Sequence, residues 1–126
     1  LLCAMNGLRR HIYLEEEFLF PPLKTGGLGM PIFVMVREHG ELWDAMDALD
    51  ELLASAADNE VLHNACRELL AKLDSHNSKE EPIIYPQADA ALDAEYQAVV
   101  AKLSPKLQEF LDSGSMPAAW RCEKAT

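Results

Sequence analysis

The sequence predicts an all-α fold, and three features favour this class. Apolar residues recur at intervals of three and four, the spacing that places them on one face of a helix. Proline and glycine mark breaks between these periodic segments. The alternation of apolar and polar residues that is typical of strands does not compete in any segment. The chain has 126 residues, of which 49% are hydrophobic, so one domain with a buried core is expected.

The first helix is expected over residues 1–20, where the apolar positions have mostly helical spacing. Pro21 and Pro22 should end it, because proline lacks the amide hydrogen that a helix interior needs. The glycine-rich stretch that follows predicts a loop. A second helix is expected to begin near Pro31, since proline suits a first turn, and to end near Ala57.

A third helix should follow directly. Asp58 and Asn59 offer an N-terminal cap, and apolar residues continue at helical spacing beyond them. The prolines at positions 82 and 86 predict that this helix ends between Pro82 and Pro86.

The last part of the chain is expected to be helical and then irregular. A fourth helical segment is predicted over about 88–111, with an interruption at Pro105. Residues 114–126 predict a loop. The expected organisation is therefore one helical domain, 1–113, followed by a C-terminal tail, 114–126.

Composition excludes several classes of function. Eleven basic residues against 21 acidic ones give a net charge of −10, which disfavours nucleic acid and anionic membranes and favours cations. No apolar run reaches the length of a membrane span. The three cysteines are odd in number and irregularly spaced, so neither a disulfide framework nor a CxxC zinc knuckle fits. A reducing cytoplasm is the expected location.

One pattern of eleven residues occurs twice. It reads His-x3-Glu-Glu-x2-apolar-aromatic-Pro, first from His11 to Pro21 and again from His76 to Pro86. A histidine and a glutamate four residues apart lie on one face of a helix, about 6 Å apart along its axis. Two such pairs can share a metal centre.

Three histidines should lie at one height in the bundle. Short connections predict antiparallel neighbours, and His11, His39 and His76 each lie about eight to ten residues from the same end. Imidazoles with carboxylates and no thiolates suit iron, manganese or zinc, and bridging carboxylates suit two metals. A single histidine on a helix is more often a paired or surface residue, but the duplicated pattern with a third level histidine favours a metal site.

These residues resemble those of the hemerythrin-like, or HHE cation-binding, family. The resemblance rests on the two repeated segments and on Arg37-Glu38-His39, and it extends over residues 1–86. It implies an antiparallel, up-down four-helix bundle around a non-haem diiron centre, for which zinc or manganese are substitutes. By motif position, the ligands implied are His11, Glu15, His39, His76 and Glu80, with the two glutamates bridging.

The chain departs from the family pattern at three points. The first helix of the family, which carries a further histidine, has no counterpart before Leu1, so this helix is expected to be missing from the chain. Trp43 stands where invertebrate hemerythrins have a second histidine, which points to the bacterial branch. Classical hemerythrins space the last carboxylate five residues after the histidine, so Glu81 remains an alternative to Glu80.

Other residues near the motifs have two interpretations each. Glu16, Glu17 and Glu81 are candidates for orienting an imidazole, although Glu17 fits a solvated helix face equally well. Trp43 would either line one side of the metal site or belong to the hydrophobic core. His63 is predicted to lie on the surface, far from the site.

A histidine-rich site carries less negative charge than a ferritin-like site, which should favour reversible binding of a diatomic ligand, O2 or NO. The first hypothesis is a diiron protein that binds O2 or NO as a sensor, store or scavenger. The second is a diiron redox protein or a donor of iron for the repair of iron–sulfur centres, and the third is a metal-free or zinc-filled helical interaction module. A binding protein is favoured over an enzyme. A bundle without its first helix would expose an apolar groove, so the chain should form a homo-oligomer through it or depend on an upstream helix.

Overall fold

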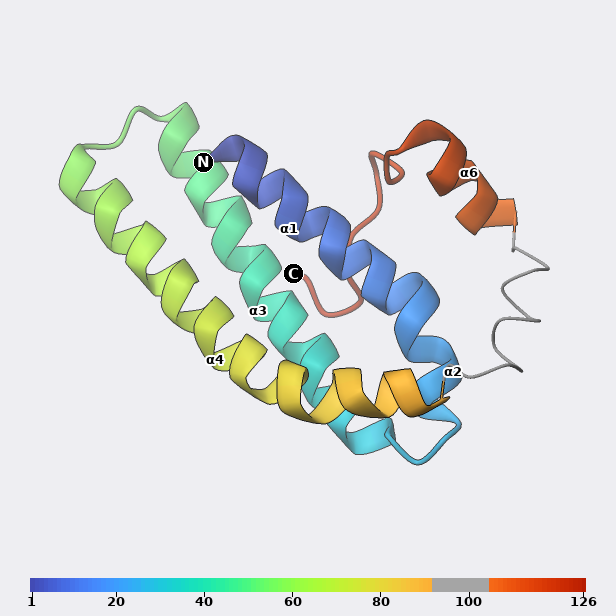
Figure 1. Cartoon of the computed structure of the whole chain (residues 1–126). Coiled ribbons are helices and arrows are strands. Elements are labelled where there is room, and N and C mark those ends of the chain that lie inside the picture. Colours follow the sequence, from blue (N-terminus) through green and yellow to red (C-terminus); the bar gives the residue numbers. More distant parts are fainter. Residues whose placement is uncertain (92–104) are drawn as a thin grey trace.

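The structure is a computed structural model that describes residues 1–91 and 105–126. Its elements in chain order are α1 (Leu2–Leu14), the π-helical turn η1 (Glu15–Leu19), α2 (Phe20–Lys24), α3 (Gly29–Ala54), α4 (Asn59–Ala91) and α6 (Pro105–Ser113). The three long helices lie side by side and alternate in direction, with α3 between α1 and α4 (Figure 1). The described residues contain no strand, so the prediction of an all-α, hemerythrin-like helical bundle is confirmed. None of their helices combines the length and the apolar character needed to cross a bilayer.

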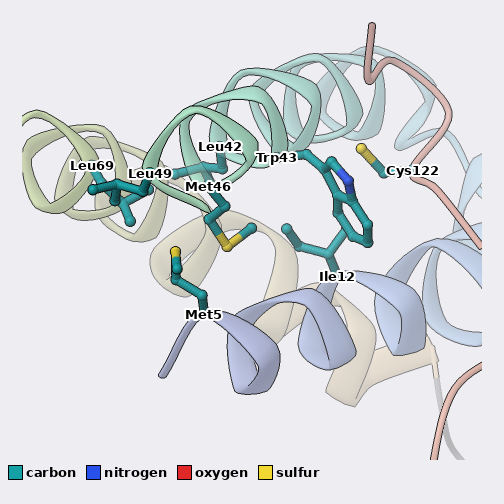
Figure 2. Packing of buried hydrophobic residues seen from close by; sticks show 8 residues of the cluster. All are labelled: Met5, Ile12, Leu42, Trp43, Met46, Leu49, Leu69 and Cys122. Atoms are coloured by element: carbon teal, nitrogen blue, oxygen red, sulfur yellow. The ribbon is translucent and has the colours of Figure 1, made fainter. Parts of the chain in front are cut away.

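Two apolar clusters form the core. Figure 2 shows the first, which joins α1, α3, α4 and the C-terminal segment and consists of Met5, Ile12, Leu42, Trp43, Met46, Leu49, Leu69 and Cys122. The second surrounds α2 and consists of Phe20, Leu23, Leu28, Ile32, Met35, Val36, Ile84 and Ala88.

Five buried polar residues lie between the two clusters. On η1, α3 and α4 alike, they stand in sequence between residues of the first cluster and residues of the second. These residues, called the polar layer below, are Glu15, Glu38, His39, His76 and Glu80. On α3, for example, Val36 belongs to one cluster and Leu42 to the other, and Glu38 and His39 stand between them in sequence. The apolar packing above and below thus fixes the three helices on which the polar layer depends.

The prediction that Pro21 and Pro22 end the first helix is wrong. The chain widens into the turn η1, in which the Phe20 amide donates to the Glu15 carbonyl, and both prolines then occupy the first turn of α2. Proline is tolerated there because the first amides of a helix have no helical acceptor.

The prediction that the third helix ends between Pro82 and Pro86 is also wrong, since α4 continues to Ala91. The two prolines are four residues apart, so they lie on the same face, and both are exposed, as is Ser78 one turn earlier. Water can therefore satisfy the carbonyls that the prolines leave without a donor. The opposite face buries Ile84 in the second cluster, which offsets the cost of interior prolines.

The remaining boundaries are close to those predicted. The Val61 amide donates to Asp58 Oδ1 over 3.0 Å, which confirms the cap before α4. The helix α3 ends at Ala54, slightly before the predicted Ala57. Of the fourth predicted segment, residues 92–104 lie outside the described part of the chain, and α6 starts at the predicted break, Pro105. Residues 114–126 are not helical, as predicted.

Candidate metal centre

The repeated motif and α3 bring their side chains to one place. His39, His76 and Glu80 form one group, and His11, Glu15 and Glu80 form another. Within each group, one potential ligand atom from every residue lies within 4.8 Å of the others. Because Glu80 belongs to both groups, the two groups adjoin. The helices therefore present two adjacent clusters of nitrogen and oxygen atoms, each of a type that binds transition metals.

The first group is sealed from solvent. His39, His76 and Glu80 are all buried, and the two imidazole rings are 4.9 Å apart between centroids. The buried Phe20 stacks on His39, with a centroid distance of 5.6 Å and an angle of 13° between the rings. His76 Nε2 faces Glu80 Oε2 across one turn of α4. These contacts leave little freedom for either imidazole.

The second group is open on one side. The side chain of His11 is 54% exposed, whereas Glu15 beside it is buried. His11 Nε2 lies within ion-pair distance of Glu15 Oε1. The same nitrogen is 3.2 Å from the hydroxyl oxygen of Tyr85. This second group is therefore the part of the site that solvent and small molecules reach.

Each buried imidazole is held through its Nδ1 atom. His39 Nδ1 is 2.7 Å from Glu16 Oε2, and His76 Nδ1 is 3.2 Å from Glu38 Oε1, which is paired in turn with Lys79. An ionised carboxylate only accepts hydrogen bonds, so Nδ1 carries the hydrogen in both rings. The lone pair of Nε2 is then free to face the site. This is the arrangement in which histidines bind metals.

Four buried atoms of the polar layer have no hydrogen-bond partner among the described residues: Glu15 Oε1, Glu15 Oε2, His39 Nε2 and Glu80 Oε1. All four donate electron pairs. Burying such atoms without a partner costs free energy, about 1–3 kcal/mol each and more for charged groups. A cation between them would remove this cost, so the residues present fit a bound metal.

The pKa values of the two buried carboxyl groups shift in opposite directions when no cation lies between them. Burial raises the pKa of Glu15 to about 10, and the neighbouring Glu80 carboxylate adds to this rise. Burial also opposes the ionised form of Glu80, but the neighbouring His76 outweighs it and holds the pKa of Glu80 at about 2. Burial would lower the pKa of His76, yet Glu80 and Glu38 raise it overall. The site without metal thus stores protons that a cation would displace.

The acidic residues that adjoin the candidate ligands in sequence differ in burial and in the contacts they make. Glu81 is exposed, whereas Glu80 is buried within both groups. Glu16 orients an imidazole, as one sequence interpretation predicted. Glu17 does not: its Oε1 accepts from the indole of Trp120 over 2.8 Å.

Sequence reasoning missed three contributors to the site. Glu38 on α3 is a hydrogen-bond partner of His76 on α4, and Tyr85 on α4 is a hydrogen-bond partner of His11 on α1. Neither contact follows from spacing within one helix. The C-terminal segment also reaches the site, because the Glu123 amide donates to Glu16. The signal for Glu38 was its place beside His39 on a helix with an otherwise apolar inner face.

Comparison with known proteins gives a consistent picture. Residues 2–88 match the family described as "Hemerythrin HHE cation binding domain". The proteins named iron-sulfur cluster repair protein YtfE from Yersinia pestis (strain Pestoides F) and Yersinia pseudotuberculosis (serotype O:1b) are each 28% identical over 99 residues. The alignment covers 70% of this chain and 44% of each relative, so the chain spans less than half the length of these curated relatives. No solved structure matches it.

Proposed function

The chain belongs to the hemerythrin HHE cation-binding domain family, and we propose that it binds two non-haem irons and, through them, a diatomic ligand, O2 or NO. In this proposal His39 and His76 would hold one iron, His11 and Glu15 would hold the other, and Glu80 would contact both. Glu15 also has a second oxygen available for bridging.

The observation that carries the proposal is the set of unpartnered electron-pair donors in the polar layer. Three buried side chains point such atoms into one place, and Glu80 links the two groups of ligands. A chain whose acidic pairs were only solvated faces would not bury these atoms without partners. The metal-free alternative is therefore disfavoured.

The protein residues would set the properties of the metals. The irons, when bound, would supply the coordination position and the electrons that a diatomic ligand requires. Glu16 and Glu38 fix the tautomers of the two buried histidines, and Phe20 stacks on the His39 ring. The His11 side chain is 54% exposed, so a small ligand would approach the site from this side. These features suit reversible binding as a sensor, store or scavenger. All three cysteines are free thiols, which suits the proposed cytoplasmic location.

A second candidate is an iron donor in the repair of iron–sulfur centres. It is favoured by the name of the relatives and by the exposure of His11, which would let an iron leave. The two candidates differ in one measurement. A repair protein should transfer iron to an apo iron–sulfur protein, whereas a ligand-binding protein should keep its iron and change its absorption spectrum when O2 or NO is added.

The proposal is tested by loading the chain anaerobically with iron(II) and measuring the bound metal. About two irons per chain are expected, with bands in the near ultraviolet and visible after oxidation. Glu80→Gln should lose most of the iron, because a neutral amide binds two cations poorly. Glu81→Gln is the matched control, since this neighbouring carboxylate is exposed. Equal iron retention in both variants, or uptake of a single zinc and no iron, would contradict the proposal.

A further inference from the structure

The C-terminal segment 120–126 contacts η1 and α3. In Figure 1 the end of the chain is seen between α1 and α3. It is fixed by four polar contacts: Trp120 Nε1 to Glu17, Arg121 to Asp47 at 2.8 Å, the Glu123 amide to Glu16 at 3.0 Å and the Thr126 amide to Asp44 at 3.0 Å. Trp120 also packs edge-on against Trp43 and Tyr13, and Cys122 is buried in the first apolar cluster. The segment is therefore packed into the domain.

One of these contacts continues to a proposed ligand. Glu16 Oε1 accepts the Glu123 amide hydrogen, and Glu16 Oε2 faces His39 Nδ1 at 2.7 Å. Both oxygens of this carboxylate thus have a donor, one from the C-terminal segment and one from α3. A carboxylate held at both oxygens cannot rotate without breaking one of the two bonds.

A glycine permits this close approach. A Cβ atom on Gly40 would lie 2.6 Å from the backbone oxygen of Lys124 and 2.8 Å from its backbone carbon. Glycine inside a helix is less favourable than alanine, and Gly40 directly follows His39 within α3. The missing side chain is what lets the C-terminal backbone pack on the helix at the level of the metal centre.

We infer that the C-terminal segment positions the metal centre: the Glu123 amide fixes Glu16, and Glu16 fixes the tautomer and orientation of His39. The inference rests on the proposed function, because His39 is a ligand only if the site binds metal. Glu16 and Glu123 are positioning residues, since neither is placed on the metal itself. Loss of one such outer contact typically lowers metal affinity by 10–100-fold.

The geometry of the segment offers a precise test. The Ala125 amide donates to the Cys122 carbonyl over 3.2 Å, which makes a turn with Glu123 at its second position. Proline is favoured at this position of a turn but has no amide hydrogen. Glu123→Pro therefore removes the donor to Glu16 and keeps the turn. Glu123→Ala is the matched control, because it removes the same exposed side chain and keeps the amide hydrogen.

The experiment is a titration of the full chain with cobalt(II), whose visible bands report the geometry of its ligands. Glu123→Pro should bind cobalt(II) at least about tenfold more weakly than Glu123→Ala, with changed visible bands. Equal affinity and equal spectra of the two variants would overturn the inference. Failure of the wild-type chain to bind cobalt(II) would instead refute the proposed function, and the inference with it.

A second pair of variants guards against misfolding of the proline variant. Gly40→Ala should displace the segment, which is measured as faster alkylation of the buried Cys122, and should weaken cobalt(II) binding as well. Gly7→Ala is the control, since a Cβ there meets nothing within 4 Å. A purely structural segment would give faster alkylation of Cys122 with unchanged cobalt(II) affinity, and that result would overturn the inference. Unchanged alkylation in Gly40→Ala would overturn it too.

Discussion

Metal binding should release about one proton from Glu15. Burial, followed by the neighbouring Glu80, raises the pKa of this carboxyl to about 10, so it is protonated at pH 7 in the absence of metal. A cation that uses Glu15 as a ligand must displace this proton. Glu80 releases none, because its pKa of about 2 leaves it ionised already, whereas the raised pKa of His76 adds to the release at lower pH.

The apparent affinity for the cation should depend on pH. Protons compete with the cation for Glu15, so the apparent affinity should rise with pH, by about tenfold per pH unit for each proton displaced. The assay is calorimetric titration with cobalt(II) in buffers of different ionisation enthalpy, which counts the protons released. Glu15→Gln should lower the count by about one, and Glu81→Gln should not change it. A wild-type count near zero, or the same count in Glu15→Gln as in the wild type, would refute the reasoning.

Three further predictions concern the fold. Burial, followed by the charge of Glu16, raises the pKa of the Cys122 thiol to about 12. An alkylating reagent at pH 8 should therefore modify the exposed Cys3 long before Cys122. Similar alkylation rates of the two thiols would contradict the packing of the C-terminal segment. Met46→Ala should lower the free energy of unfolding by about 2–5 kcal/mol in a denaturant titration, because Met46 is fully buried, and Met30→Ala, at an exposed site, should change it little. Pro82→Ala should raise the melting temperature, since an exposed proline inside a helix costs about 3 kcal/mol; a lower melting temperature would show that the proline has a packing role.

The repeated motif made much of the site predictable. A histidine and a glutamate one turn apart must share a helix face, so the pairs at His11 and His76 followed from spacing alone. The convergence of the three histidines followed from alternating helix directions. The helical structure of these segments followed from the three- and four-residue spacing of their apolar residues.

Two kinds of feature lay beyond that reasoning. Pro21 and Pro82 were expected to end helices, because local propensity takes no account of a π-helical turn or of an exposed face where water replaces the lost bonds. The contacts of Glu38 and Glu123 join residues 38 and 107 positions apart in sequence, so only the packed structure reveals them. The C-terminal segment in particular reads as a loop in the sequence, and only its packing against Gly40 and Glu16 relates it to the site.

The most direct test of the two-iron site is a crystal of the protein loaded with iron(II) under anaerobic conditions, measured at the iron absorption edge. Two anomalous peaks are expected. One should lie between His39, His76 and Glu80, and the other between His11, Glu15 and Glu80. A single peak, or peaks away from the polar layer, would contradict the account.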